Sequence, residues 1–156
     1  MSSLANKIDR IAPLYRFLQQ TVADYMTRTV KTVTRETSVR ELNRMFEEDD
    51  FNTYPVEEDM QVVGLVTKFD LLKCFAFTPS QMVPRYDDLM NRKVADIMTS
   101  AFIYVGADTK LTRVLQLMVE HKIRSIPAID NDHRLVGIVA REDVIRALAA
   151  CVQADK

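Results

Sequence analysis

The chain carries the six-residue stretch VADYMT at residues 22–27 and repeats it as VADIMT at residues 94–99, 72 positions further on. Three further pairs keep almost the same spacing: Pro55 with Pro127, Gly64 with Gly137, and Asp70 with Asp143. The last two pairs are 73 residues apart, so one extra residue enters the second copy. A long repeat that occurs twice predicts two supersecondary units about a pseudo-twofold axis rather than a solenoid. Such paired units create related clefts, where small ligands bind.

Outward from this stretch, each copy predicts the order β-α-β-β-α. A β-branched or aromatic run opens each copy, at residues 30–33 and 102–105. A helix and then two strands follow, the strands at 54–56 and 62–67 in the first copy and at 125–129 and 135–140 in the second. We expect the closing helices to start at Asp70 and Asp143. The predicted fold class is therefore α/β, two β-α-β-β-α repeats packed as a pseudo-twofold module, with helices covering one side of a small sheet.

The inner helix of each copy is predicted from its capping residues and apolar spacing. In the first copy Thr37 or Ser38 is the expected N-cap, and Ser38 with Glu41 has the pattern of a capping box. In the second copy the expected N-cap is Asp108 or Thr109. The predicted buried faces are Val39, Leu42, Met45 and Phe46 in one helix and Leu111, Val114, Leu115 and Met118 in the other.

Residues 1–21 stand outside the repeat and form a predicted N-terminal helical extension. Apolar residues alternate at spacings of four and three, which is helical periodicity on one face: Leu4, Ile8, Ile11, Tyr15, Leu18 and Val22. Pro13 predicts either a kink or a helix that begins near residue 13. The segment either docks on the domain or forms a dimer contact. We divide the chain into 1–21, repeat 1 at 22–78, a partly helical connection at 79–93, and repeat 2 at 94–151.

Composition limits the possible functions. The chain has 156 residues, 47% of them apolar and 28% charged, and its net charge is −1, so no basic field would attract nucleic acid or anionic lipid. No apolar run approaches the roughly 18 residues of a membrane span, and the N-terminus lacks the apolar stretch of a signal peptide. We expect a soluble, cytoplasmic protein with no nucleic-acid or membrane partner.

Metal chemistry and catalysis are disfavoured too. The two cysteines, Cys74 and Cys151, and the two histidines, His121 and His133, are isolated from other ligand-type residues. Reduced thiols are the expectation for such cysteines. The sequence contains no nucleophile elbow, no zinc-protease motif and no phosphate-binding glycine loop. We therefore expect a protein that is not an enzyme and requires no cofactor.

The candidate binding motif is a strand, a turn and a helix start, at residues 63–70 and 136–143. In the first copy Thr67 at the strand end and Asp70 at the helix start offer a hydroxyl and a carboxylate to one cleft. Backbone N–H groups at a helix N-terminus favour phosphate, and a carboxylate suits a ribose diol. The same residues also fit a purely structural role as helix caps. The spacing alone supports both interpretations equally.

The ordered set of motifs resembles a pair of CBS domains, the regulatory repeats named after cystathionine β-synthase. The resemblance covers about residues 22–150 and rests on Met26-Thr27 and Met98-Thr99, Tyr54-Pro55-Val56 and Ile126-Pro127-Ala128, and the two segments that run from Gly64 to Asp70 and from Gly137 to Asp143. It implies clefts between the repeats that bind adenosine-containing ligands such as AMP, ADP, ATP or S-adenosylmethionine. It also implies a homodimer and regulation of a protein target that the sequence does not identify.

Carried over residue by residue, the resemblance implies two nucleotide sites. In the first, Asp70 holds ribose, Thr67 lies near phosphate, Thr53 lines the wall, and Tyr104 and Val105 of the other copy flank the base. In the second, Asp143 holds ribose, Arg124 and Ser125 line the wall, and Thr32 and Val33 flank the base. Lys68 and Arg141 follow the phosphate positions and either compensate phosphate charge or lie on the solvated surface.

The second copy departs from the pattern. Ala140 replaces the hydroxyl residue that precedes this aspartate, which removes a contact of about 1.5–3 kcal/mol if it is made to a charged phosphate. Glu142 adds negative charge beside Asp143. We expect unequal sites, with the Asp70 site the stronger, unless Arg124 or Arg141 reaches the phosphate. The alternative function is a dimerisation or protein-interaction module with vestigial clefts and no nucleotide.

Overall fold

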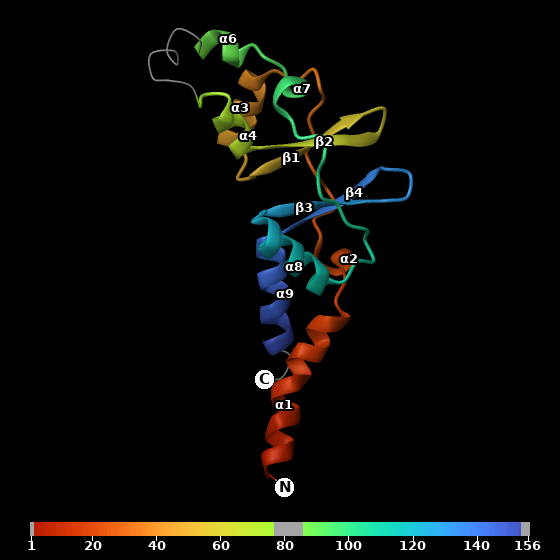
Figure 1. Cartoon of the computed structure of the whole chain (residues 1–156). Coiled ribbons are helices and arrows are strands. Elements are labelled where there is room, and N and C mark those ends of the chain that lie inside the picture. The colour runs from red at the N-terminus through yellow and green to blue at the C-terminus, as the bar shows by residue number, and fades with distance from the viewer. Residues whose placement is uncertain (1, 77–85, 154–156) are drawn as a thin grey trace. The chain divides into compact units, whose positions relative to one another are not determined.

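The structure is a computed structural model that describes residues 2–76 and 86–153 (Figure 1). It divides into two compact units. Unit 1 comprises Met1–Val30, Tyr104–Asp130 and Val136–Lys156, and unit 2 comprises Lys31–Ile103 and Asn131–Leu135. The units do not coincide with the sequence repeats, because the opening stretch of each repeat, at residues 22–27 and 94–99, belongs to the unit that holds the paired strands and closing helix of the other repeat.

Unit 2 contains the inner helix, paired strands and closing helix of the first repeat, together with the opening stretch of the second repeat. Its elements are α3 (Val39–Glu48), β1 (Thr53–Glu58), β2 (Gln61–Thr67), α4 (Lys68–Lys73), α6 (Tyr86–Met90) and α7 (Val94–Ile97). The strands β1 and β2 pair antiparallel, with Thr53 opposite Thr67 and a register shift between Val56 and Glu57. Apolar residues from the run at residues 30–33, from α3, from both strands and from α7 form the core: Val33, Leu42, Phe46, Tyr54, Val56, Val66 and Val94.

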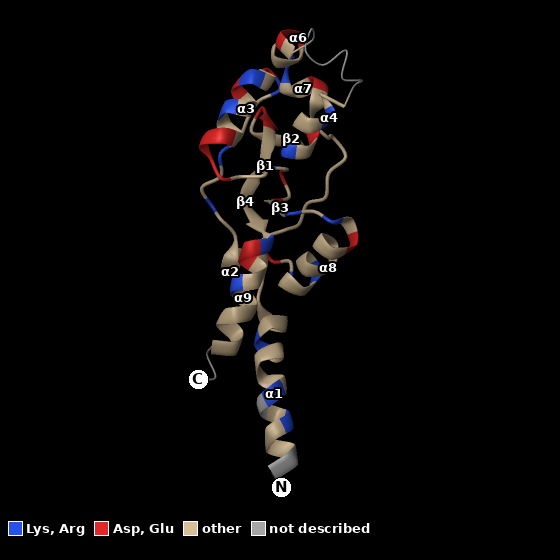
Figure 2. Cartoon of the chain, turned by 90° about the vertical axis from the view of Figure 1, so that its left-hand side faces the viewer, with Lys and Arg blue, Asp and Glu red and all other residues tan. Residues whose placement is uncertain are grey.

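Unit 1 contains the N-terminal helix, the opening stretch of the first repeat, and the inner helix, paired strands and closing helix of the second repeat. Its elements are α1 (Ser2–Gln19), α2 (Val22–Tyr25), α8 (Leu111–His121), β3 (Ser125–Ile129), β4 (Leu135–Ala140, whose first residue is assigned to unit 2) and α9 (Arg141–Gln153). The strands β3 and β4 form a second two-stranded sheet. The C-terminal part of α1 packs beside α9, as Figures 1 and 2 both show. Phe17 of α1 is buried in this contact region.

The repeated Met-Thr pairs serve as short pairing segments on the sheets. In unit 1 the N–H groups of Thr27 and Ile138 each donate to the other residue's carbonyl at 2.9 Å. In unit 2 Thr99 and Leu65 exchange the same two bonds, at 2.8 and 3.0 Å. The close approach requires glycine on each strand. A Cβ on Gly64 would lie 3.0 Å from the Thr99 carbonyl oxygen, and one on Gly137 would lie 2.9 Å from that of Thr27.

The four paired strands are confirmed, whereas several boundaries differ from prediction. The opening runs form only isolated parallel bridges, Val33 with Val56 and Val105 with Ala128. The N-terminal helix begins at Ser2 and continues through Pro13, so a start near residue 13 is wrong. Of the predicted connection, residues 79–85 lie outside the described residues, and α6 is helical as expected.

The caps and buried faces were predicted correctly in the first repeat more often than in the second. Ser38 caps α3 by accepting the Glu41 N–H at 3.1 Å. The N-cap of α8 is Lys110, not Asp108 or Thr109, because the Thr109 hydroxyl accepts the Gly106 N–H instead. On α8, Leu115 was predicted on the buried face but is exposed, and Leu117, which was not predicted there, is buried. On α3, Met45 is only partly buried.

Cys74 and Cys151 are buried free thiols. Among the described residues, no group of three or more His, Cys, Asp or Glu side chains could hold a metal ion. No described helix combines the length and apolar character that a transmembrane span needs.

Candidate functional site

The carboxylate of Asp70 is held in a capping box at the start of α4. Thr67 is the N-cap, and Asp70 lies three residues into the motif rather than at the helix start that the sequence predicted. Asp70 Oδ2 accepts the Thr67 N–H at 2.9 Å and the Thr67 hydroxyl at 3.0 Å. The same hydroxyl accepts the Asp70 N–H at 3.1 Å. Oδ2 is therefore fully engaged in capping.

The second oxygen of Asp70 is held more loosely. Asp70 Oδ1 lies 3.1 Å from Nζ of Lys73, whose side chain is largely exposed. It also accepts a long hydrogen bond of 3.4 Å from the Thr99 hydroxyl. The residue is nevertheless only 4% exposed. The carboxylate is thus fixed through one oxygen, while the other contacts a largely exposed lysine and a hydroxyl near the limit of hydrogen-bond distance.

Asp143 repeats this arrangement in unit 1. It accepts the Ala140 N–H on Oδ2 at 2.8 Å, and its Oδ1 lies 3.1 Å from Nη2 of Arg146. The residue is 6% exposed. The capping arrangement at Asp143 lacks the hydroxyl that Thr67 supplies at Asp70, because Ala140 occupies that position. The closing helix starts at Arg141, two residues before the predicted position, just as α4 starts at Lys68.

Two other aspartates in the chain show that this capping geometry does not require burial. Asp24 Oδ2 accepts the Thr21 N–H at 2.9 Å, and Asp96 Oδ2 accepts the Lys93 N–H at 3.2 Å. Both aspartates are exposed. Burying a carboxylate is costly, so helix capping explains the position of Asp70 and Asp143 but not their burial. The burial of these two residues is the feature that points to a further role.

The predicted wall residues lie at the strand ends next to the aspartates. Thr53 begins β1 and pairs with Thr67 at the end of β2, so both hydroxyl residues lie at one end of the sheet. Ser125 begins β3 in unit 1. Its hydroxyl oxygen is buried, and within the described part of the chain it has no hydrogen-bond partner. A buried hydroxyl without a partner is uncommon and is explained if a ligand supplies the bond.

The basic residues proposed for phosphate already have contacts within the protein. The Lys68 N–H donates to the Asn52 carbonyl, and its Nζ lies 5.9 Å from the Phe46 ring centroid. The Arg141 N–H donates to the Arg124 carbonyl, and its Nε lies 3.4 Å from Glu142. Phosphate binding by Lys68, Arg124 or Arg141 stays a prediction.

The predicted base-flanking residues belong to the opening runs. In unit 2, Val33 is buried and bonds through its backbone to Pro55 and Glu57 of β1, with Thr32 just before it. In unit 1, Val105 makes the matching bonds to Pro127 and Ile129 of β3, and Tyr104 is half-exposed. Each pair thus shares a unit with the aspartate of the other predicted site. Their contact with the base stays a prediction.

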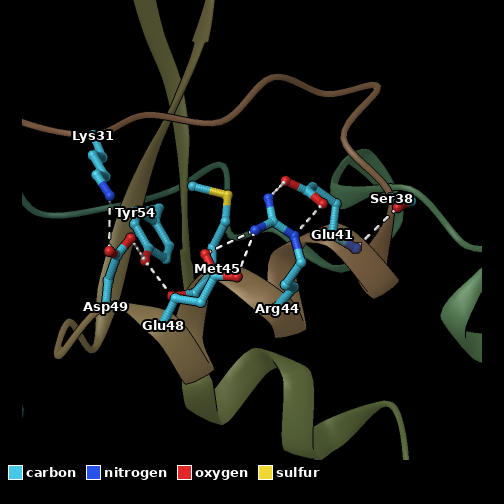
Figure 3. Close-up of polar contacts among 8 residues, drawn as sticks. All are labelled: Lys31, Ser38, Glu41, Arg44, Met45, Glu48, Asp49 and Tyr54. Atoms are coloured by element: carbon cyan, nitrogen blue, oxygen red, sulfur yellow. Dashed lines mark hydrogen bonds and ion pairs between the residues drawn. The ribbon is translucent and has the colours of Figure 1, made fainter.

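The sequence analysis did not predict a polar cluster beside β1, the strand that begins at Thr53. Figure 3 shows Asp49 between Lys31 and Tyr54; it accepts from Lys31 Nζ at 2.8 Å and from the Tyr54 hydroxyl at 2.9 Å. The hydrogen bond from Lys31, and then that from Tyr54, lowers the pKa of Asp49. Burial raises the pKa of Tyr54. The cluster connects two neighbours of predicted site residues to the C-cap of α3, Asp49. These neighbours are Lys31, which precedes Thr32, and Tyr54, which follows Thr53.

Thr99 was also missed as a partner of Asp70. Its signal in the sequence was the repeated Met-Thr pair, which we used only to recognise the repeat. The bond between Thr99 and Asp70 spans 29 residues, so local spacing did not indicate it.

Comparison with known proteins agrees with this architecture. The CBS domain family matches residues 22–76 and 94–150. The chloroplastic CBS domain-containing protein CBSX1 of Arabidopsis thaliana is 31% identical over 149 residues, which cover 81% of this chain and 63% of that protein. A homoserine O-acetyltransferase of Methanosarcina acetivorans is 29% identical over 124 residues, which cover 79% of this chain but only 21% of that enzyme. The chain spans less than two thirds of the length of these curated relatives.

Solved structures share the fold. CBSX2 from Arabidopsis thaliana in complex with AMP has a TM-score of 0.71 and 29% identity, covering 83% of this chain and 97% of that one. Protein MJ1225 from Methanocaldococcus jannaschii has a TM-score of 0.79 and 23% identity, covering 89% of this chain and 51% of that one. Each repeat has a pair of strands, and the same family matches both repeats. The chain belongs to the CBS domain family and carries two copies of the domain.

Proposed function

We propose that this chain is a regulatory module that binds an adenosine-containing nucleotide at Asp70 and at Asp143. Binding of the nucleotide changes the conformation of the module, and a protein target responds to that change. The observation that carries the proposal is the burial of these two carboxylates, since Asp24 and Asp96 cap helices in the same way and stay exposed. The AMP complex of CBSX2, a relative at 29% identity, supports the ligand class.

The two oxygens of each carboxylate have different roles in this proposal. Oδ2 is fixed by the backbone N–H of Thr67 or Ala140, which orients the group before ligand arrives. Oδ1 accepts the ribose hydroxyls, replacing the long Thr99 contact at Asp70 and loosening the ion pairs with Lys73 and Arg146. A charged acceptor makes stronger hydrogen bonds than a neutral one. The unpartnered hydroxyl of Ser125 adds a polar contact at the second site.

Titration calorimetry with AMP tests the proposal on conservative variants. Asp70→Asn and Asp143→Asn keep an oxygen for the capping bond but remove the charge. We expect each to weaken binding at its own site by about tenfold to a hundredfold, because a hydrogen bond to a charged group contributes about 1.5–3 kcal/mol. Asp24→Asn and Asp96→Asn are matched controls with the same local geometry, and we expect them to leave AMP binding unchanged.

The competing function is an interaction module with vestigial clefts. A thermal-unfolding panel of AMP, ADP, ATP, S-adenosylmethionine and NADH separates the two. A ligand at a hundredfold excess over its Kd stabilises the folded chain by about 2.7 kcal/mol. A panel without any shift would favour the interaction module. AMP binding that is equally tight in all four aspartate variants would instead show that the nucleotide does not bind at Asp70 or Asp143.

A further inference from the structure

The N-terminal helix α1 carries a row of exposed apolar side chains. Leu4, Ile8, Ile11, Tyr15 and Leu18 are 69%, 60%, 44%, 62% and 41% exposed. We call these five residues the α1 seam. They follow one another at spacings of four, three, four and three residues. The seam lies before residue 22, where the CBS match begins, so the CBS domain fold does not account for it.

The opposite face of α1 is the one that docks on its own unit. Phe17 is buried, and Arg16 Nη1 donates to the Cys151 carbonyl of α9 at 3.3 Å. Pro13, on the same side, is partly buried. At 3.6 residues per turn, the centre of this docked face lies roughly 170° around the helix axis from the centre of the seam. Docking on α8 and α9 therefore leaves the seam uncovered.

The spacing of the seam is that of a coiled-coil contact. An alternation of three and four places Ile8 and Tyr15 at a positions and Leu4, Ile11 and Leu18 at d positions of a heptad. Leu14, which is 56% exposed, lies at a g position beside the seam and widens its apolar edge. We propose that a second copy of this chain covers the seam, with the two α1 helices parallel.

The exposed area is sufficient for a small stable interface. Five large side chains that each bury about 80 Å² would contribute roughly 400 Å² per copy and 800 Å² per pair. Homodimer interfaces are about 65% apolar, so this corresponds to roughly 1,200 Å² in total. That is the lower bound of stable protein–protein interfaces, about 1,200–2,000 Å².

Two further features favour self-pairing. Short isolated helices are marginal in water, but docking on α9 already orders the C-terminal part of α1, so dimerisation extends a helix that is partly fixed. In a parallel pair, residues beside the seam meet as Lys7 with Ala12 and Leu14 with Gln19 of the second copy. No like charges are opposed in that arrangement, and Leu at d positions is typical of parallel two-stranded pairs.

Light scattering of the full chain and of seam variants tests the proposal. We expect the unmodified chain to have twice the 17.9 kDa mass of one copy, and Ile8→Asp or Ile11→Asp to lower the apparent mass towards one copy at micromolar concentration. Asn6→Asp makes the same change of one charge on an exposed position about 160° from the seam. It should leave the mass unchanged. Circular dichroism checks that all variants keep their helices.

A cysteine variant tests pairing even if another surface also holds two copies together. Parallel helices place residue 4 opposite its own equivalent, so oxidised Leu4→Cys should run as a covalent dimer on a non-reducing gel. The native thiols of Cys74 and Cys151 are buried, so the unmodified chain is the control. A monomeric chain, absence of the Leu4→Cys cross-link, or flotation of a monomer with anionic vesicles that Ile8→Asp abolishes would overturn the proposal. None of these measurements depends on nucleotide.

Discussion

The Asp70 and Asp143 regions differ mainly by one hydroxyl group, and the difference changes the interpretation of that group. The sequence suggested that Thr67 contacts phosphate and that Ala140 loses this contact. In the structure the Thr67 hydroxyl already donates its proton to Asp70 Oδ2. Asp143 reaches the same position with the Ala140 N–H alone. The hydroxyl therefore reinforces the carboxylate, and it must give up that bond before it can donate to a phosphate.

The largest contrast between the two regions should come from the glycines that face the Met-Thr segments. A Cβ on Gly137 would lie 2.5 Å from Met26 Sδ and 2.9 Å from the Thr27 oxygen, whereas one on Gly64 has no contact below 3.0 Å. Overpacking typically costs about 1–3 kcal/mol. We expect Gly137→Ala to lower the free energy of unfolding towards the upper end of that range and Gly64→Ala towards the lower end, as measured by urea titration.

Gly106→Ala provides the control for this comparison. Its added Cβ would meet the Asp108 side chain at 2.9 Å, which can rotate away, instead of a backbone carbonyl. Its cost should be smaller than that of either strand glycine. Equal losses for Gly64→Ala and Gly137→Ala would show that Met26 moves aside easily and that the two pairing segments are equally tolerant, and a larger loss for Gly64→Ala would reverse the expected order.

Exchanging the residues that differ provides the next test. Thr67→Ala should destabilise the chain by about 1 kcal/mol, because it removes a helix N-cap. Ala140→Thr should stabilise it by a similar or smaller amount, provided that the new hydroxyl reaches Asp143 as Thr67 reaches Asp70. Since the hydroxyl acts on the carboxylate, AMP affinity should change by less than tenfold in both variants, measured by calorimetry.

A loss of more than a hundredfold in Thr67→Ala, with the stability only modestly changed, would contradict this interpretation. It would show that the Thr67 hydroxyl leaves the capping box to bind phosphate. Thr21→Ala is a matched control, because the Thr21 hydroxyl also contacts the carboxylate of a capping aspartate, Asp24, but that aspartate is exposed.

The sequence predicted the features that depend on local periodicity. All four paired strands and the positions of Asp70 and Asp143 next to them follow from the repeat. The helix starts were wrong by two residues, because an aspartate in a capping box was taken for the first helical residue. Thr99 and the Lys31–Asp49–Tyr54 cluster were missed because their contacts join residues that are distant in sequence. The burial of the two aspartates likewise depends on packing that spacing does not encode.

The Lys31–Asp49–Tyr54 cluster marks a smaller difference between the repeats. At an offset of 72 the second repeat has Ile103, His121 and Ile126, which cannot form the same bonds. Exposed ion pairs such as those of Arg44 with Glu41 and Glu48 on the same helix contribute little. Tyr54 is different, because its ring is fully buried and its hydroxyl bonds to both Asp49 and the Met45 carbonyl.

This cluster predicts a small acid-sensitive contribution from the first repeat. The pKa of Asp49 is lowered from its ordinary value of 3.8 in the folded chain, by the Lys31 bond first and the Tyr54 bond second. The stabilisation is therefore complete above the ordinary pKa and is lost as pH falls through the lowered folded value. Asp49→Asn should flatten the fall in unfolding free energy between about pH 5 and pH 2, measured by urea titration at each pH.

Lys31→Met should flatten this fall partly, because the Tyr54 bond remains. Asp50→Asn, at a neighbouring exposed aspartate, serves as the control. If the unfolding free energy falls equally steeply with pH in Asp49→Asn and in the unmodified chain, Asp49 has the same pKa in the folded and unfolded chain. The two repeats would then not differ in this respect.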